Sequence, residues 1–165
     1  MPDAFKSYLK AERNYQVAAL NPRYADDLPQ DAELRRHLQT VSRWISSTGY
    51  YDRKAMAAAM NYFGSKYAAK GTIYRGTVGL HFDGAPSSYT KSRKVAETFA
   101  FNVASYGSKK DIFVIRRKAP RNSLDFRKLL RAYATCSIKH CDEAEVIAFN
   151  TPVPTGQLTE YTFVD

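Results

Sequence analysis

The chain has 165 residues, a formal net charge of +9 and 44% hydrophobic residues. This length predicts a single domain that buries about 70% of its unfolded surface, so a stable core needs neither disulfides nor a metal. The first residues form no apolar segment, and the longest apolar runs are too short to span a bilayer, so we expect a cytoplasmic protein without a membrane partner. The positive charge indicates acidic partners, such as nucleic acid, acidic protein surfaces or phosphate-bearing small molecules.

The first part of the chain, residues 1 to about 70, has helical patterns. Residues 4–20 are consistent with a first helix, and the next helix is predicted over residues 31–45 from apolar side chains that recur every three or four positions. Asp31 stands where the N-cap of that helix belongs. Residues 53–63, rich in Ala and Met, predict a further helix.

From about residue 71 to 165 the pattern becomes strand-rich. One more helix is predicted over residues 91–101, with Ser92 as its N-cap. Four segments read as strands: 72–74, 111–116, 145–149 and 161–164. Two loops, 102–110 and 133–142, flank the candidate site residues described below, and Tyr74 and Phe99 are interpreted as core residues. Helices followed by strands predict an α+β domain over residues 1–165.

The cysteines, Cys136 and Cys141, stand close together with His140 between them. That spacing suggests a zinc site, but the sequence offers no second pair of ligands. We therefore expect free thiols in a reducing compartment, and no bound metal.

Two glutamates, Glu143 and Glu145, lead into the apolar strand that ends at Phe149. Side chains alternate faces along a strand, so both carboxylates point the same way, roughly 6–7 Å apart. Such a pair is unfavourable near a buried strand unless a positive group meets it. A solvated strand end is the alternative interpretation, and metal binding is discounted because no Asp or His with suitable spacing lies nearby.

Two other segments carry polar side chains that could serve the same site. Arg75 ends a short strand and can present a planar fork of donors to a phosphate, while Gly76 lets a ligand approach the backbone closely. The hydroxyl groups of Ser88, Tyr89 and Thr90 precede the helix at residues 91–101 and could orient an acidic side chain. The alternatives are an ordinary edge-strand arginine and an ordinary N-cap with its turn.

Three motifs follow one another in the chain: Tyr-Arg-Gly, then Ser-Tyr-Thr with the helix Lys-Ser-Arg-Lys-Val-Ala-Glu-Thr-Phe-Ala after it, and then Glu-Ala-Glu-Val-Ile. In this order they resemble the motifs of the mono-ADP-ribosyltransferases. The resemblance is to their arginine–serine–glutamate class, which includes cholera-toxin-like and clostridial toxins, vertebrate ecto-enzymes and bacteriophage enzymes. It extends from Ile45 to roughly Thr151. It implies N-terminal helices followed by a split, two-sheet β core with a cleft for NAD.

The resemblance also implies a role for each matching residue. Arg75 would bind a phosphate of NAD, and Gly76 would offer its backbone to the nicotinamide carboxamide. Ser88 would hydrogen-bond the catalytic glutamate, Glu145. Glu143 would be the upstream acid that in this family accompanies arginine acceptors.

The chain departs from the family at its serine motif, where Ser-Tyr-Thr replaces Ser-Thr-Ser. The first hydroxyl is kept at Ser88 and the third becomes Thr90, so the supporting role is expected to survive. Tyr89 is bulkier than the family threonine. All three residues are expected to line the NAD site.

The resemblance implies a transferase that moves ADP-ribose from NAD to an arginine of a target protein and releases nicotinamide. The charge suits an acceptor near nucleic acid, such as host transcription or translation machinery. It also suits a bacteriophage enzyme or bacterial effector acting in the host cytoplasm. Two alternatives stay open: an NAD glycohydrolase without a protein acceptor, and a basic nucleic-acid-binding domain based on segments such as Tyr62 to Lys70.

Overall fold

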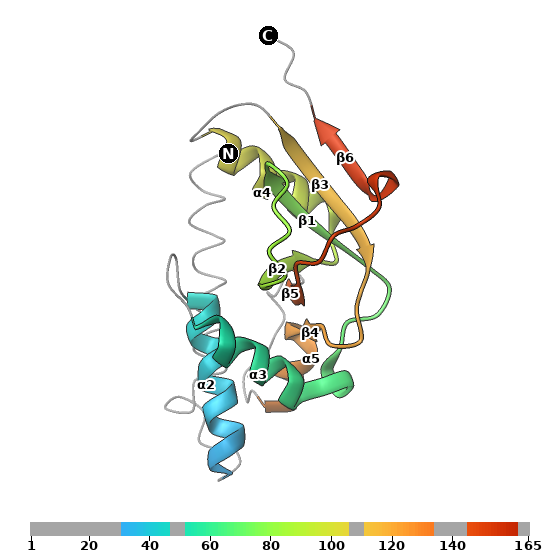
Figure 1. Ribbon diagram of the computed structural model, residues 1–165. Coiled ribbons are helices and arrows are strands. Elements are labelled where there is room, and N and C mark those ends of the chain that lie inside the picture. Colours follow the sequence, from blue (N-terminus) through green and yellow to red (C-terminus); the bar gives the residue numbers. More distant parts are fainter. Residues whose placement is uncertain (1–30, 47–51, 106–110, 134–144, 162–165) are drawn as a thin grey trace.

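The computed structural model describes residues 31–46, 52–105, 111–133 and 145–161 (Figure 1). Several predicted features lie outside these ranges: the helix at residues 4–20, most of the two predicted loops, both cysteines, His140 and Glu143. None of the helices in the described part of the chain combines the length and the apolar character that crossing a bilayer requires.

Helices α2 (Ala32–Ser46) and α3 (Arg53–Phe63) match the two predicted helices closely. The Asp31 carboxylate accepts hydrogen bonds from the backbone N–H groups of Glu33 and Leu34 at 2.9 and 3.2 Å, as an N-cap should. Asp52 caps α3 in the same way by accepting from Ala55 N–H. The capping residues therefore set where both helices begin.

Within the described residues, six strands form one antiparallel sheet in the order β4-β5-β2-β1-β3-β6. Their bounds are β1 (Thr72–Val78), β2 (Pro86–Thr90), β3 (Ile112–Lys118), β4 (Leu124–Asp125), β5 (Glu145–Phe149) and β6 (Leu158–Tyr161). The predicted α+β class is confirmed, whereas the expected division into two sheets is not shown. The junction between β1 and β2 is nevertheless narrow, because its register is the single pair Tyr74–Thr90.

The helices cover different parts of this sheet (Figure 1). Helices α2, α3 and α5 (Phe126–Tyr133) enclose the largest core cluster together with Leu124 and Ile147 of the β4–β5 end. Helix α4 (Arg93–Ser105) packs on β1 and β3 instead, where Ala100 meets Ile112. A third cluster joins Ile73, Tyr89, Ile115 and Val146. The 3-10 turns η1 (Gly64–Tyr67) and η2 (Thr155–Gln157) complete the fold.

Several boundaries differ from the predictions. The segment Pro86–Thr90, for which no strand was predicted, is a strand because its backbone pairs with β5 along its whole length. Helix α4 continues through Asn102 to Ser105, four residues beyond its predicted end. The last strand begins at Leu158, earlier than predicted, because that residue pairs with Ile115 of β3. Helix α5 was not predicted, although Asp125 caps it through the N–H groups of Arg127 and Lys128.

Candidate functional site

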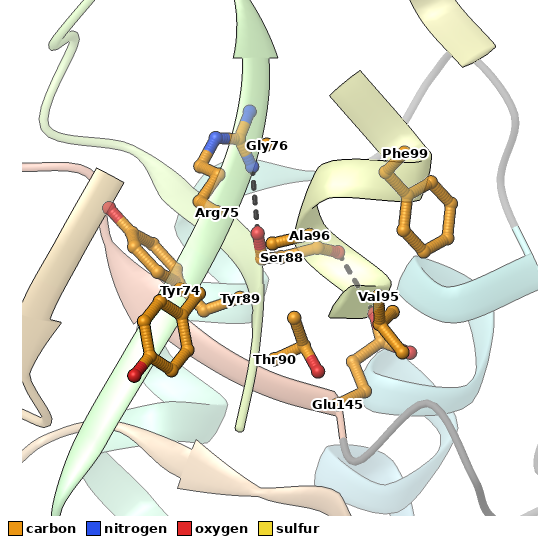
Figure 2. Close-up of a pocket in the computed structure, with 10 residues that line it drawn as sticks. All are labelled: Tyr74, Arg75, Gly76, Ser88, Tyr89, Thr90, Val95, Ala96, Phe99 and Glu145. Carbon is orange, nitrogen blue, oxygen red and sulfur yellow. Dashed lines mark hydrogen bonds between the residues drawn. The ribbon is translucent and has the colours of Figure 1, made fainter. Parts of the chain in front are cut away.

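A pocket of about 130 Å³ opens where β1, β2, β5 and α4 meet (Figure 2). Ten residues line it: Tyr74, Arg75, Gly76, Ser88, Tyr89, Thr90, Val95, Ala96, Phe99 and Glu145. Six of the seven residues predicted from the sequence are therefore brought together, and the seventh, Glu143, lies outside the described residues. These residues come from three segments that lie far apart in the chain, around Arg75, Ser88 and Glu145.

The pairing of β2 with β5 brings Ser88 to Glu145. Glu145 lies directly opposite Thr90, and Ser88 is two residues from Thr90 on the same strand, so all three side chains share one face of the sheet. The Ser88 hydroxyl donates a 2.9 Å hydrogen bond to Oε1 of Glu145. Only 4% of Glu145 is exposed. The carboxylate is thus held in place by a neighbouring strand and shielded from bulk water.

Arg75 reaches the same point from β1. Its Nη1 donates a 2.9 Å hydrogen bond to the backbone carbonyl oxygen of Ser88, the residue whose hydroxyl binds Glu145. A guanidinium has five N–H donors, and within the described residues this is the one hydrogen bond that the Arg75 side chain makes. The remaining donors can bind an anion that enters the pocket.

The Tyr89 ring lies near two guanidinium groups, with the Cζ atoms of Arg75 and Arg117 at 6.0 and 5.9 Å from its centroid. Both distances are within the range of cation–π attraction. Its hydroxyl donates a 3.1 Å hydrogen bond to Oδ1 of buried Asn150, whose Nδ2 donates in turn to the His81 carbonyl oxygen. Tyr89 is therefore held through both its ring and its hydroxyl, and it helps to orient Arg75.

Thr90 has a different role from Ser88. Its Oγ1 accepts a 3.0 Å hydrogen bond from the backbone N–H of Ser92, and Ser92 Oγ accepts from Val95 N–H as the predicted N-cap of α4. Thr90 therefore helps to turn the chain from β2 into the helix that walls the pocket. The next residue, Lys91, forms a 2.8 Å ion pair with buried Asp125.

Gly76 is required by the packing of α4. A Cβ at this position would overlap the carbonyl oxygen of Ala96 and lie 2.9 Å from Cβ of Ala100. The sequence suggested that this glycine admits a ligand to the backbone. The structure adds a second reason, because only a residue without a side chain lets the helix lie this close to β1.

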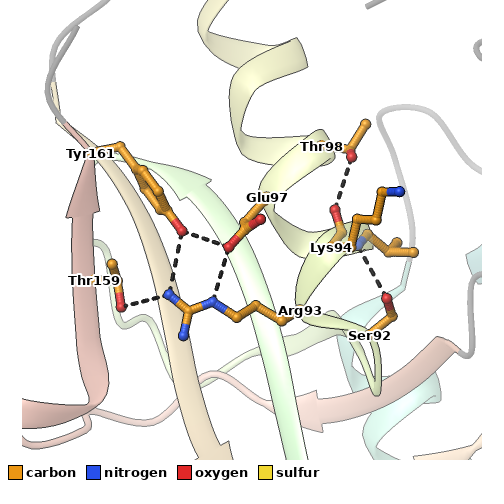
Figure 3. A network of polar contacts seen from close by, with 8 residues as sticks. Ser92, Arg93, Lys94, Glu97, Thr98, Thr159 and Tyr161 are labelled. Atoms are coloured by element: carbon orange, nitrogen blue, oxygen red, sulfur yellow. Dashed lines mark hydrogen bonds and ion pairs between the residues drawn. The ribbon is translucent and has the colours of Figure 1, made fainter.

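A polar network fixes the outer face of α4 to β6 (Figure 3). Arg93 Nε donates to Glu97 Oε1 at 2.9 Å, and Arg93 Nη2 reaches Thr159 Oγ1 and the Tyr161 hydroxyl at 3.4 Å. The Tyr161 hydroxyl donates to the same Glu97 oxygen at 2.7 Å. Hydrogen bonds from Tyr161 and then from Arg93 lower the pKa of Glu97 below its usual value. Hydrogen bonds of Arg93 to Tyr161 and then to Glu97 raise the pKa of Arg93. The network holds the helix that carries one wall of the pocket.

Tyr74 and Phe99 were interpreted as core residues, and this interpretation is wrong in part. Both side chains are half-buried and line the pocket, one from β1 and one from α4. Their positions beside Arg75 and on the inner face of the helix could have indicated this. Val95, Ala96 and Asn150 were missed, because an apolar helix face and a lone asparagine carry no signal of a site in the sequence.

The described residues contain no group of three or more His, Cys, Asp or Glu side chains placed to hold a metal ion. The pocket instead offers one carboxylate, one guanidinium, hydroxyl groups and aromatic walls. This set can bind a ligand with an anionic part through Arg75 and stabilise positive charge beside Glu145.

Comparisons with models of protein families, with curated proteins and with solved structures found no match to this chain. Any assignment of its function therefore depends on the chemistry of the pocket together with the motifs of the sequence.

Proposed function

We propose that the protein transfers ADP-ribose from NAD to a protein acceptor, on arginine, and releases nicotinamide. The observation that carries the proposal is the linked set of contacts at one pocket, in which Arg75 bonds the Ser88 carbonyl and the Ser88 hydroxyl bonds Glu145. These are the arginine, serine and glutamate that the sequence resemblance assigns to this chemistry, and their contacts do not depend on that resemblance.

The reaction breaks the bond between nicotinamide and C1′ of the adjoining ribose. Positive charge develops on the sugar as nicotinamide leaves, so a fixed carboxylate beside it stabilises the transition state more than the ground state. Glycoside hydrolysis follows the same principle. Glu145 is the carboxylate of the pocket, and the Ser88 hydrogen bond keeps it in one orientation without neutralising it.

The residues present suit one end of NAD better than the whole molecule. The pocket of about 130 Å³ is smaller than the roughly 300–1,000 Å³ of sites that enclose drug-sized ligands. It would take the nicotinamide and its ribose between Tyr74, Phe99 and Glu145, with a phosphate near Arg75. The narrow β1–β2 junction supports the finer expectation of a two-part sheet with NAD at the division, since the strands are joined by one register pair there.

The acceptor nitrogen forms a new bond to C1′ and must lose a proton. A guanidinium has a pKa above about 12 and is a poor nucleophile until a base accepts that proton. Glu143 precedes the strand residue Glu145 by two positions, so we assign it this role. Water in place of the acceptor would give NAD hydrolysis from the same carboxylate. The charge of +9 favours acceptors in acidic or nucleic-acid-bound surroundings, such as host transcription or translation machinery.

Incubation of the protein with NAD, with and without an arginine-rich protein, tests the proposal through two products: free nicotinamide and ADP-ribosyl protein. We expect nicotinamide in both reactions and more of it when the acceptor is present. The variant Glu143→Gln should lose transfer and retain some hydrolysis. Absence of nicotinamide from the wild-type reaction would refute the proposal, and nicotinamide without any modified protein would reduce it to NAD hydrolysis.

A further inference from the structure

A second pocket, of about 400 Å³, lies where the chain leaves η1, enters β1 and leaves β3. It is larger than the first pocket and shares no lining residue with it. Three of its lining residues are cationic, namely Lys70, Lys118 and Arg121, and none is acidic. All three are exposed, and none forms an ion pair with another described residue.

The rest of the lining is made of small residues. Gly71 and Ala119 join the start of β1 to the end of β3 through a 2.8 Å hydrogen bond from Ala119 N–H to the Gly71 carbonyl oxygen. Gly71 adopts φ +81°, a left-handed conformation that favours glycine. Ala69 is buried, and its N–H donates to Ser123 Oγ at 3.1 Å. The base of the pocket is therefore fixed, and the three cations above it are exposed to solvent.

The cationic surface extends along β3 toward the first pocket. Arg116 and Lys118 are exposed and two residues apart, so they lie on one face of the sheet, roughly 7 Å apart. Their register partners on β1 are Tyr74 and Thr72, respectively. Tyr74 lines the first pocket and Lys118 lines the second, so the β3 cations run from one to the other.

We propose that the second pocket binds phosphate groups of a nucleic-acid strand, which then follows the β3 cations toward the first pocket. Protein and peptide partners are recognised through aromatic or aliphatic anchors in apolar pockets, and no large apolar side chain lines this one. Nucleic acid needs no such anchor, because affinity comes largely from cations that neutralise phosphates. The exposed Arg116 continues the cationic surface beyond the pocket, and cations spread over this length fit a polymer better than a single phosphate. This inference goes beyond the proposed transferase activity and does not depend on it.

Fluorescence anisotropy of a labelled single-stranded oligonucleotide, titrated with the full-length protein at several salt concentrations, tests the proposal. The double variant Lys70→Gln/Lys118→Gln should weaken binding by about tenfold or more. It should also lower the salt slope by about 1.4, since each lost phosphate contact on a single strand accounts for about 0.7. The matched control Arg36→Gln/Lys54→Gln removes the same charge from exposed positions on α2 and α3 and should leave both quantities nearly unchanged.

Unlabelled competitors and the folded state of the variants complete the test. Equal weakening by both double variants, or no binding by the wild type, would overturn the proposal, because the charge would then act diffusely or not at all. If polyglutamate competes for binding as well as the unlabelled oligonucleotide does, the nucleic-acid proposal is overturned in favour of an acidic protein partner. A mononucleotide that competes equally would overturn the polymer in favour of a small phosphate ligand. Urea unfolding midpoints equal to the wild type's show that a loss of binding is local.

Discussion

The Ser88 hydroxyl donates a 2.9 Å hydrogen bond to Oε1 of Glu145, although 57 positions separate the two residues in the chain. The contact exists because β2 and β5 pair with Thr90 opposite Glu145, which sets Ser88 diagonally across from the carboxylate. Arg75 bonds the carbonyl oxygen of the same serine. One residue thus connects the cation and the anion of the pocket.

Ser88→Ala should reduce the rate constant for nicotinamide release by about 10- to 100-fold. A hydrogen bond to a charged group contributes about 1.5–3 kcal/mol, and each 1.4 kcal/mol corresponds to a tenfold change. KM for NAD should change less than kcat, because the hydroxyl orients Glu145 rather than binding the substrate. The control is Ser87→Ala, because the Ser87 hydroxyl donates to the Ala85 carbonyl oxygen and not to Glu145. An equal loss in both variants would argue against a specific role for Ser88.

Gly76→Ala should destabilise the fold by about 3 kcal/mol or more, at the upper end of overpacking effects. The added methyl group meets the backbone of Ala96, which cannot move aside as a flexible side chain can. Urea denaturation measures the change. Gly156→Ala in η2 is the matched control, because no atom lies within 4 Å of its added Cβ. If both variants unfold at the wild-type urea concentration, α4 does not pack against β1 as described.

Tyr89 offers a pair of substitutions that separate its ring from its hydroxyl. Tyr89→Phe should cost about 1–3 kcal/mol of stability, because the buried Oδ1 of Asn150 loses its donor, while KM for NAD stays nearly constant. Tyr89→Leu should also raise KM by about two- to fivefold, since Arg75 loses a cation–π contact of about 0.5–1 kcal/mol. Steady-state kinetics and urea denaturation of both variants measure the two effects. A KM that rises equally in both would contradict the role assigned to the ring.

How far the sequence predicts this molecule depends on the range of the interactions involved. Asp31, Ser92 and the spacing of apolar residues are local signals, and they placed α2 and the start of α4 well. The strand at Pro86–Thr90 has no such signal, because its conformation depends on pairing with β5, far along the chain. The same dependence concealed Asn150, whose role requires Tyr89 to lie beside it. The ordered motifs predicted the candidate site residues that meet at the pocket, but not the helix and aromatic residues that wall it.

His37 should make stability depend on pH. Burial, and then the charge of Arg36, lower the pKa of the His37 imidazole below its usual value of 6.5, while Glu33 opposes them. The unfolded chain therefore binds the proton more readily than the folded chain. The contribution of neutral His37 to the free energy of unfolding is complete above about pH 6.5 and is lost as the pH falls below it. Urea denaturation between about pH 7.5 and about pH 5.5 should show a smaller decline for His37→Gln than for the wild type. Parallel declines in the two proteins would contradict this assignment.

The most direct test of the central claim is the rate of nicotinamide release from NAD by Glu145→Gln. The substitution keeps the shape of the side chain and removes its charge, so the rate should fall by at least about 100-fold, the scale of a lost electrostatic group at a transition state. Glu160→Gln, at an exposed position on β6, should match the wild type. A Glu145→Gln protein that is folded and releases nicotinamide at the wild-type rate would contradict the role of this carboxylate.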